Sequence, residues 1–113
     1  MPFIHIHTNT TVSADKADAI KAKLGKAITD IPGKSEQWLM VGIDDAATQY
    51  FQGNDAPAAI AQDSLYGSAS GTALDRLTSD ITEILHGELA LEPGRIYVSY
   101  MTTPDWGWSG RNF

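Results

Sequence analysis

The sequence has no cysteine, and this absence removes three kinds of chemistry at once. A chain without thiols cannot form disulfides, bind a metal through thiolates or use a cysteine nucleophile. Long apolar runs are also missing, since no stretch approaches the roughly 20 residues that a membrane-spanning helix needs. The first residues, MPFIHIHTNT, lack the basic and apolar regions of a signal peptide. We therefore expect a cytoplasmic protein, or one exported without a signal peptide.

Basic residues are scarce relative to acidic ones. The chain has 8 Lys and Arg against 14 Asp and Glu, which gives a formal net charge of −6. Such a surface repels nucleic-acid phosphates and anionic lipid headgroups, so we expect neither nucleic acid nor membrane as a partner. The length of 113 residues and the hydrophobic content of 42% are typical of one globular domain, which we assign to residues 1–113.

The first half of the chain predicts a strand, a helix and a second strand. β-branched residues dominate the stretch 2–8, and apolar residues then recur at helical spacing from Ala17 to Ile31. Ser13 is a suitable N-cap for this helix, and Pro32-Gly33 ends it. The run WLMVGI over 38–43 predicts the next strand, and 48–51 a short further one.

The second half repeats this order. A strand is predicted over 57–66, an amphipathic helix from near Ser70 to near Gly87, and a strand over 95–100, followed by an aromatic tail over 102–113. The repetition indicates an internal βαβ duplication. Right-handed crossovers would place both helices on one face of the sheet. The opposite face would then expose Val, Ile and Tyr side chains, which oligomerisation would cover.

An ordered set of short motifs runs through the whole chain. It comprises Met1-Pro2 at the start of a strand, Gly33-Lys34, Phe51 with Gly53, Tyr66-Gly67, the stretch RIYV over 95–98, and the ending WGWSGRNF over 106–113. Together these resemble the macrophage migration inhibitory factor family of tautomerases. The resemblance implies an α+β fold: a duplicated βαβ subunit, with a four-stranded mixed sheet and two helices on one face. It also implies a homotrimer with active sites between subunits.

The resemblance makes Pro2 the catalytic residue. Once Met1 is removed, the N-terminal amine of Pro2 would serve as the general base of a cofactor-independent keto–enol tautomerase. An α-amine has an ordinary pKa of about 7.7–8.0, and burial or a nearby cation lowers it further towards neutrality. The expected substrates are phenylpyruvate-like or dopachrome-like enol and keto acids. A chain that keeps Met1 would hold Pro2 as an amide, which cannot act as a base.

The other candidate residues would bind substrate. By resemblance, Lys34 holds the substrate carboxylate and the backbone N–H of Tyr66 contacts the substrate. Tyr97 either reaches into the site from a neighbouring subunit or packs in the core. Ser99 stands where many members carry an asparagine that grips a ring hydroxyl.

Two tryptophans of the tail complete the set. By resemblance, Trp106 and Trp108 would wall the pocket, pack between subunits, or do both.

Two other functions stay open. The chain could be a cytokine-like ligand for a receptor, with vestigial tautomerase activity. It could also use the same base for dehalogenation or decarboxylation, although no arginine lies beside Pro2 in the sequence. The pair His5 and His7 shares a strand face, but no third ligand is evident, so we expect no metal.

Overall fold

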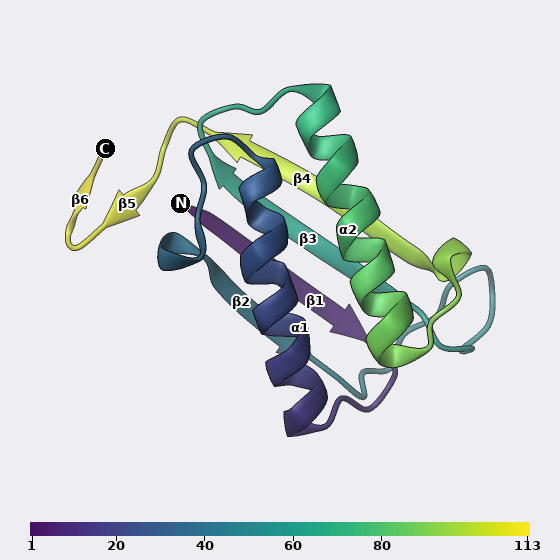
Figure 1. The fold of residues 1–113 in the computed structure, drawn as a ribbon. Helices are drawn as coiled ribbons and strands as arrows, with labels where there is room; N and C mark the ends of the chain where they lie inside the picture. The colour runs from purple at the N-terminus through teal and green to yellow at the C-terminus, as the bar shows by residue number, and fades with distance from the viewer.

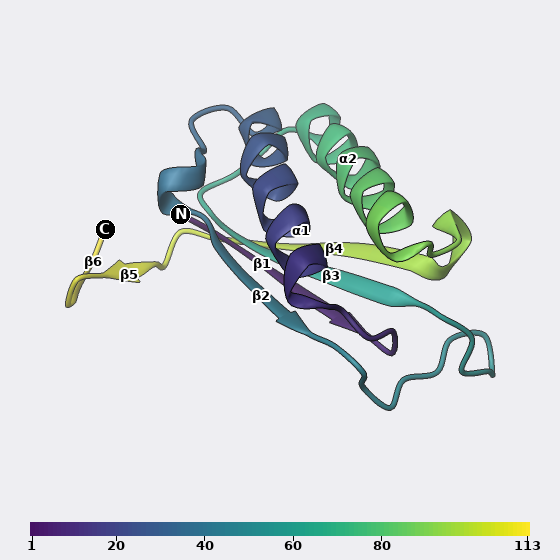
Figure 2. The same ribbon diagram turned by 60° about the horizontal axis from the view of Figure 1, so that its bottom comes forward.

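Four strands form one mixed sheet, and two helices cover one of its faces (Figures 1 and 2). The computed structural model describes all 113 residues. The main elements are β1 Pro2–Thr8, α1 Ala14–Ala27, β2 Met40–Asp44, β3 Ala59–Tyr66, α2 Gly71–Leu89 and β4 Ile96–Thr103. Two short strands, β5 Gly107–Trp108 and β6 Arg111–Asn112, form a hairpin at the C-terminus, and short 3₁₀ turns cover Ile28–Asp30, Glu36–Trp38 and Pro93–Arg95.

The sheet order β2-β1-β3-β4 confirms the predicted duplication. β1 pairs in parallel with β2, β3 pairs in parallel with β4, and the two halves join where β1 pairs antiparallel with β3. Each parallel pair is connected through one helix, as the sequence predicted. The helices begin at the predicted caps: Ser13 accepts a hydrogen bond from the N–H of Lys16, and Ser70 accepts one from the N–H of Ala73.

The structure corrects several predicted bounds. β3 begins at Ala59 instead of residue 57, and β4 runs from Ile96 to Thr103 instead of over 95–100. β2 begins at Met40, because Glu36–Trp38 form a 3₁₀ turn instead of the start of the strand. α2 continues past Gly87 and ends at Leu89. No strand forms over 48–51, where a single bridge joins Phe51 to Asn54. The backbone groups of Phe51 exchange hydrogen bonds with those of Asn54, and the Phe51 carbonyl accepts another from Arg95, so this backbone is satisfied without a sheet.

The core lies between the sheet and the helices. Alternate residues of the strands point towards the helices, as the burial of every second residue of β1 and β3 shows. The largest fully buried side chains are Ile4, Ile6, Ile20, Leu24, Ile28, Ile31, Leu65, Leu77, Ile81, Leu85 and Leu91.

No helix is both long enough and apolar enough to cross a membrane.

The opposite face of the sheet is uncovered, and its composition differs from the prediction. Alternation turns Val41, Ile43 and Val98 towards the helices, where they pack against the core. The uncovered face exposes the expected tyrosine, Tyr97, together with two methionines. Its large exposed members are Met40, Tyr97 and Met101, which are 66%, 59% and 69% exposed.

Candidate functional site

The start of β1 lies near the C-terminal hairpin, at the same end of the sheet as the beginning of β2 (Figure 1). Residues of these three segments line one cleft. The cleft has a volume of about 360 Å³. It is lined by Met1, Pro2, Phe3, Gln37, Trp38, Leu39, Met40, Trp106, Gly107 and Trp108. Three of the predicted site residues, Pro2, Trp106 and Trp108, therefore meet here from opposite ends of the chain.

The amine at the start of the chain lies in an unusual environment. Burial, together with the charge and hydrogen bonding of Lys34, lowers the pKa of the Met1 amine from 8.0 to about 6. In this structure Met1 carries the amine, and the nitrogen of Pro2 lies in the peptide bond. Pro2 itself is buried. The chain start therefore combines burial with a nearby positive charge. Both lower the pKa of an amine, so that it is neutral near pH 7.

Lys34 reaches this end of the sheet from the loop after α1. Its Nζ donates a 2.7 Å hydrogen bond to the carbonyl of Tyr66 and lies 5.8 Å from the centre of the Tyr66 ring. The turn that aims it passes through Gly33, whose φ of +84° is a left-handed conformation that residues with a side chain rarely adopt. The structure thus brings Lys34 and Tyr66 together at the chain start, although 32 residues separate them.

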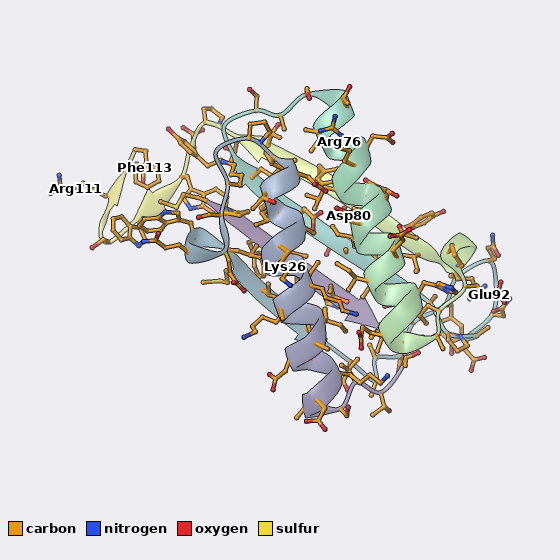
Figure 3. All side chains as sticks on the ribbon, in the orientation of Figure 1. Lys26, Arg76, Asp80, Glu92, Arg111 and Phe113 are labelled. Atoms are coloured by element: carbon orange, nitrogen blue, oxygen red, sulfur yellow. The ribbon has the colours of Figure 1, made fainter.

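The backbone N–H of Tyr66 is occupied by Met1. It donates a 3.1 Å hydrogen bond to the Met1 carbonyl, which extends the pairing of β1 with β3 by one residue. The ring of Tyr66 meets that of Phe113 edge-on, with centroids 5.2 Å apart. The last residue of the chain is thereby brought to the site; Figure 3 labels it at the end of the tail.

The two predicted tryptophans of the tail lie on one side of the cleft. The ring of Trp108 meets that of Trp38 edge-on, with centroids 5.1 Å apart, and Trp108 remains 53% exposed. The carbonyl of Trp106 accepts a hydrogen bond from the N–H of Phe113, which closes the hairpin.

Sequence reasoning did not single out Trp38 or Gln37 as site residues. Gln37 lay in the predicted loop after Lys34, and Trp38 was expected to begin the next strand, so neither had a local signal for the site.

The structure does not bring Tyr97 and Ser99 to this cleft. In the sheet register Pro2 stands opposite Leu65, whereas Tyr97 stands opposite Ile60, five residues away along β3. At about 3.4 Å per residue this places Tyr97 about 17 Å from the start of β1. Ser99 pairs with Gln62, about 10 Å away by the same measure.

The exposure of Tyr97 decides between its two predicted roles within this chain. Its ring packs on Phe51, with centroids 4.7 Å apart, and is 59% exposed on the uncovered face of the sheet. It therefore does not belong to the core of this chain. A role in catalysis would need a second copy of the chain.

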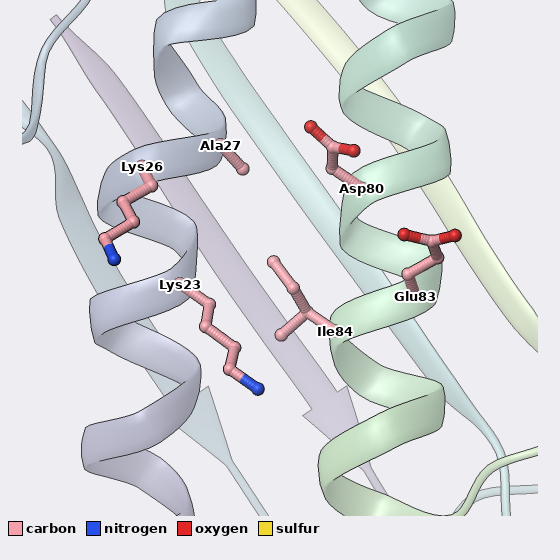
Figure 4. Close-up of a pocket in the computed structure, with 6 residues that line it drawn as sticks. All are labelled: Lys23, Lys26, Ala27, Asp80, Glu83 and Ile84. Atoms are coloured by element: carbon pink, nitrogen blue, oxygen red, sulfur yellow. The ribbon is translucent and has the colours of Figure 1, made fainter.

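A separate hollow lies between the two helices, on the far side from the sheet (Figure 4). It has a volume of about 400 Å³ and is lined by Lys23, Lys26, Ala27, Asp80, Glu83 and Ile84. Its charges are of both signs, and Lys23 is already paired with Glu88 at 2.6 Å. None of the predicted site residues lies here, so the cleft at Pro2 remains the candidate site.

Comparisons with known proteins show the family and the fold of the chain. The family model described as macrophage migration inhibitory factor (MIF) matches residues 1–113. The crystal structure of Leishmania major MIF2 has a TM-score of 0.94 at 29% identity, covering 100% of this chain and 97% of the other. The Toxoplasma gondii migration inhibitory factor has a TM-score of 0.87 at 20% identity, covering 98% and 99%.

A more distant structure shares the fold alone. That of Pt0534 inactivated by 2-oxo-3-pentynoate has a TM-score of 0.85 at 12% identity, covering 96% of this chain and 93% of the other. A search of the curated proteins finds no match. Because the family model spans the whole chain, the protein belongs to the macrophage migration inhibitory factor family.

Proposed function

We propose that the chain is a keto–enol tautomerase in which the amine of Pro2, exposed by removal of Met1, is the general base. Tautomerisation requires a base that takes a proton from the carbon beside a carbonyl, while a neighbouring group stabilises the charge that develops on the oxygen. The observation that supports the proposal is the environment of the chain start, where burial and Lys34 lower the pKa of the Met1 amine to about 6. The Pro2 amine, one residue further along β1, would be subject to the same burial and the same positive charge. An amine with such a pKa is mostly neutral at pH 7 and can accept a proton.

Removal of Met1 would change two groups together. It would convert the amide nitrogen of Pro2 into a secondary amine, and it would take away the carbonyl that now occupies the Tyr66 N–H. The base and a backbone hydrogen-bond donor would therefore become available in the same step. The Tyr66 N–H would then be free to bind a substrate oxygen.

Lys34 would hold the substrate carboxylate. Its ammonium group has three N–H donors, of which one is used by the Tyr66 carbonyl in this structure. The remaining donors can reach an anion beside the chain start, and the same positive charge disfavours protonation of the Pro2 amine. One lysine would thus both orient the substrate and keep the base neutral.

The aromatic lining supports substrates that carry a ring. Trp106 and Trp108, with Trp38 beside them, offer faces and edges for an aromatic group in a cleft of about 360 Å³. This volume is within the usual range for small-molecule sites, roughly 300–1,000 Å³. Phenylpyruvate-like or dopachrome-like acids combine such a ring with a carboxylate for Lys34.

Tyr97 and Ser99 could contribute to a site only if the chain assembles, for example as a homotrimer. Both lie on the uncovered face of the sheet, away from the cleft of their own chain. The exposed Met40, Tyr97 and Met101 on this face favour association with further copies, because assembly would remove them from water. In such an assembly we propose that Tyr97 and Ser99 complete the site of a neighbouring subunit.

The test is the rate of phenylpyruvate enol–keto conversion, followed by ultraviolet absorbance. The protein is first shown by intact mass to lack Met1, and the Pro2→Gly variant is measured beside it. We expect a rate well above that of buffer that falls by at least a hundredfold in the variant, because general base catalysis contributes about 10²–10⁴-fold. A wild-type rate equal to that of buffer would exclude this substrate class.

A covalent probe reports on the base without a natural substrate. 2-Oxo-3-pentynoate inactivates Pt0534, the structural neighbour. Its electron-poor alkyne can add a neutral amine, and its carboxylate would suit Lys34. We expect a mass increase of one adduct per chain on Pro2, and none on protein that keeps Met1. Labelling elsewhere in the chain would contradict the proposed base.

A further inference from the structure

Two histidines and one aspartate meet on the uncovered face of the sheet. His5 and His7 are alternate residues of β1, and Asp44 ends β2 directly opposite His7 in the parallel register. The Nε2 of His5 lies 2.8 Å from Asp44 Oδ2, and the Nε2 of His7 lies 3.7 Å from the same oxygen. The three side chains offer one ligand atom each, and these atoms all lie within 4.8 Å of one another.

This spacing is close to what a metal ion requires. Zn²⁺ binds imidazole nitrogen and carboxylate oxygen at about 2.0–2.2 Å, so two ligands in a tetrahedral site lie roughly 3.3 Å apart. The observed distances of 2.8 and 3.7 Å fall on either side of that value. Side-chain rotations that move the ligand atoms by about 1 Å would bring all three within bonding distance of one ion. The side chains can make them, being 27%, 36% and 61% exposed for His5, His7 and Asp44.

The neighbouring residues leave room for His5 and fix its ring. Gly42 pairs with His5 across the sheet, and a Cβ added at Gly42 would stand 3.4 Å from both the His5 and the Phe3 rings. A larger side chain there would press on the imidazole. The Phe3 ring stacks on that of His5 with centroids 5.3 Å apart and planes 22° apart. The imidazole of His5 therefore lies between the ring of Phe3 and the ring of His7, which fixes its position on the sheet.

A hydrogen bond between His5 and Asp44 does not by itself explain the second histidine. The rings of His5 and His7 lie 4.2 Å apart, and both direct Nε2 towards one carboxylate oxygen. Two protonated imidazoles at this distance would repel each other, whereas two neutral ones can bind the same cation. The sequence-based expectation of no metal rested on the lack of a third ligand, and β2 supplies one.

We propose that His5, His7 and Asp44 bind a divalent first-row transition-metal ion, with water in the remaining coordination positions. Imidazole nitrogen favours Zn²⁺, Cu²⁺, Ni²⁺ and Fe²⁺ over Mg²⁺ and Ca²⁺, which prefer oxygen ligands alone. The net charge of −6 adds a general attraction for cations. The site is distinct from the cleft at Pro2, because Pro2 faces the helix side of the sheet and these histidines face the other.

The experiment is a calorimetric titration of the untagged, chelator-stripped protein with Zn²⁺ at pH 7.5. We expect one Zn²⁺ per chain, and at least a tenfold loss of affinity in each of His5→Ala, His7→Ala and Asp44→Asn. Two matched controls keep the wild-type affinity: His86→Gln, since His86 lies at the far end of α2, and Asp55→Asn in an exposed loop. Equal affinity of His5→Ala and the wild type would overturn the proposal, as would an absence of Zn²⁺ binding by the wild type.

A second measurement separates lost ligands from lost folding. Co²⁺ in a four- or five-coordinate site with imidazole and carboxylate ligands absorbs visible light much more strongly than aqueous Co²⁺, and we expect this stronger absorption in the wild type and in His86→Gln. It should disappear in His7→Ala while the far-ultraviolet circular dichroism stays unchanged. It should also weaken from pH 7.5 to pH 5.5, because protons compete for the imidazoles. Retention of the absorption in folded His7→Ala would refute the ligand set.

Discussion

Replacing Asp63 with asparagine is expected to remove a pH-dependent loss of stability. Asp63 lies on β3 on the side that faces the helices, is only 2% exposed, and has no hydrogen-bond partner for either carboxylate oxygen. Burial raises the pKa of this carboxyl from 3.8 to about 8. The folded protein therefore keeps a proton on Asp63 that the unfolded chain releases above pH 4.

The sign of the effect follows from this difference in bound protons. Where the folded state binds more protons than the unfolded state, the free energy of unfolding falls as the pH rises. For Asp63 the fall begins near the unfolded pKa of 3.8 and ends near the folded pKa of about 8. The wild type should therefore be more stable at pH 5 than at pH 8.

The magnitude can be worked from the same values. One pKa unit corresponds to about 1.36 kcal/mol, and nearly the whole interval from pH 5 to pH 8 lies between the two pKa values. The expected loss over this interval is roughly 3–4 kcal/mol. Asparagine has nearly the same shape as aspartic acid and does not titrate, so Asp63→Asn should not show this loss.

The assay is urea unfolding of both proteins at pH 5 and pH 8, at one fixed protein concentration. The quantity to compare is the change in unfolding free energy with pH, wild type minus variant, because other titrating groups are common to both proteins and cancel. Asp55→Asn, at an exposed position, is the matched control and should behave as the wild type. A wild type and an Asp63→Asn variant with the same pH dependence would refute the reasoning.

Three further predictions concern single side chains. Lys34→Ala should lower kcat/KM for phenylpyruvate at least tenfold and move the rise of activity with pH to higher pH, because the cation no longer lowers the pKa of the amine; Lys26→Ala, away from the cleft, should change neither. Tyr97→Ala should alter KM only if a neighbouring chain contributes to the site, and unchanged kinetics in a confirmed trimer would exclude that role. Ser70→Ala removes the hydrogen bond to the first turn of α2 and should cost about 1 kcal/mol in urea unfolding, whereas Ser70→Asp should restore it.

Local sequence patterns predicted the helices and the first strand well, because burial of apolar side chains and helix capping determine these elements. Alternating or helical apolar spacing identified the first strand and both helices, and Ser13 and Ser70 marked the two helix starts. The stretch 48–51 was wrongly expected to be a strand. Its residues have high strand propensity, but propensity does not indicate whether a neighbouring strand is available for pairing. There, side chains such as Arg95 satisfy the backbone.

The sequence predicted which residues to consider for the site, and the structure shows which of them lie close together. Pro2, Lys34 and Tyr66 do meet at one end of the sheet, as expected from the resemblance. The distance of Tyr97 from that end depends on strand register, which composition does not reveal. Likewise, the approach of Asp44 to the histidines depends on the pairing of two strands that are far apart in the sequence.

The burial of the Asp63 carboxyl group has a signal in the local pattern of β3. Its neighbours at alternate positions, Ala59, Ala61 and Leu65, are apolar and buried. Because alternate residues of a strand share one face, this spacing places Asp63 on the buried side of the sheet. The size of its pKa shift has no such local signal, since it depends on how deeply the packed helices and sheet bury the carboxyl group.

The most direct test of the proposed base compares the two forms of the chain start. The processed protein and the protein that keeps Met1 are separated, identified by intact mass and assayed with phenylpyruvate at the same concentration. Catalysis by the Pro2 amine predicts that the processed form is active and that the Met1-retaining form is near the buffer rate, because its Pro2 nitrogen is an amide and its Tyr66 N–H is occupied. Comparable rates for the two forms would contradict the mechanism.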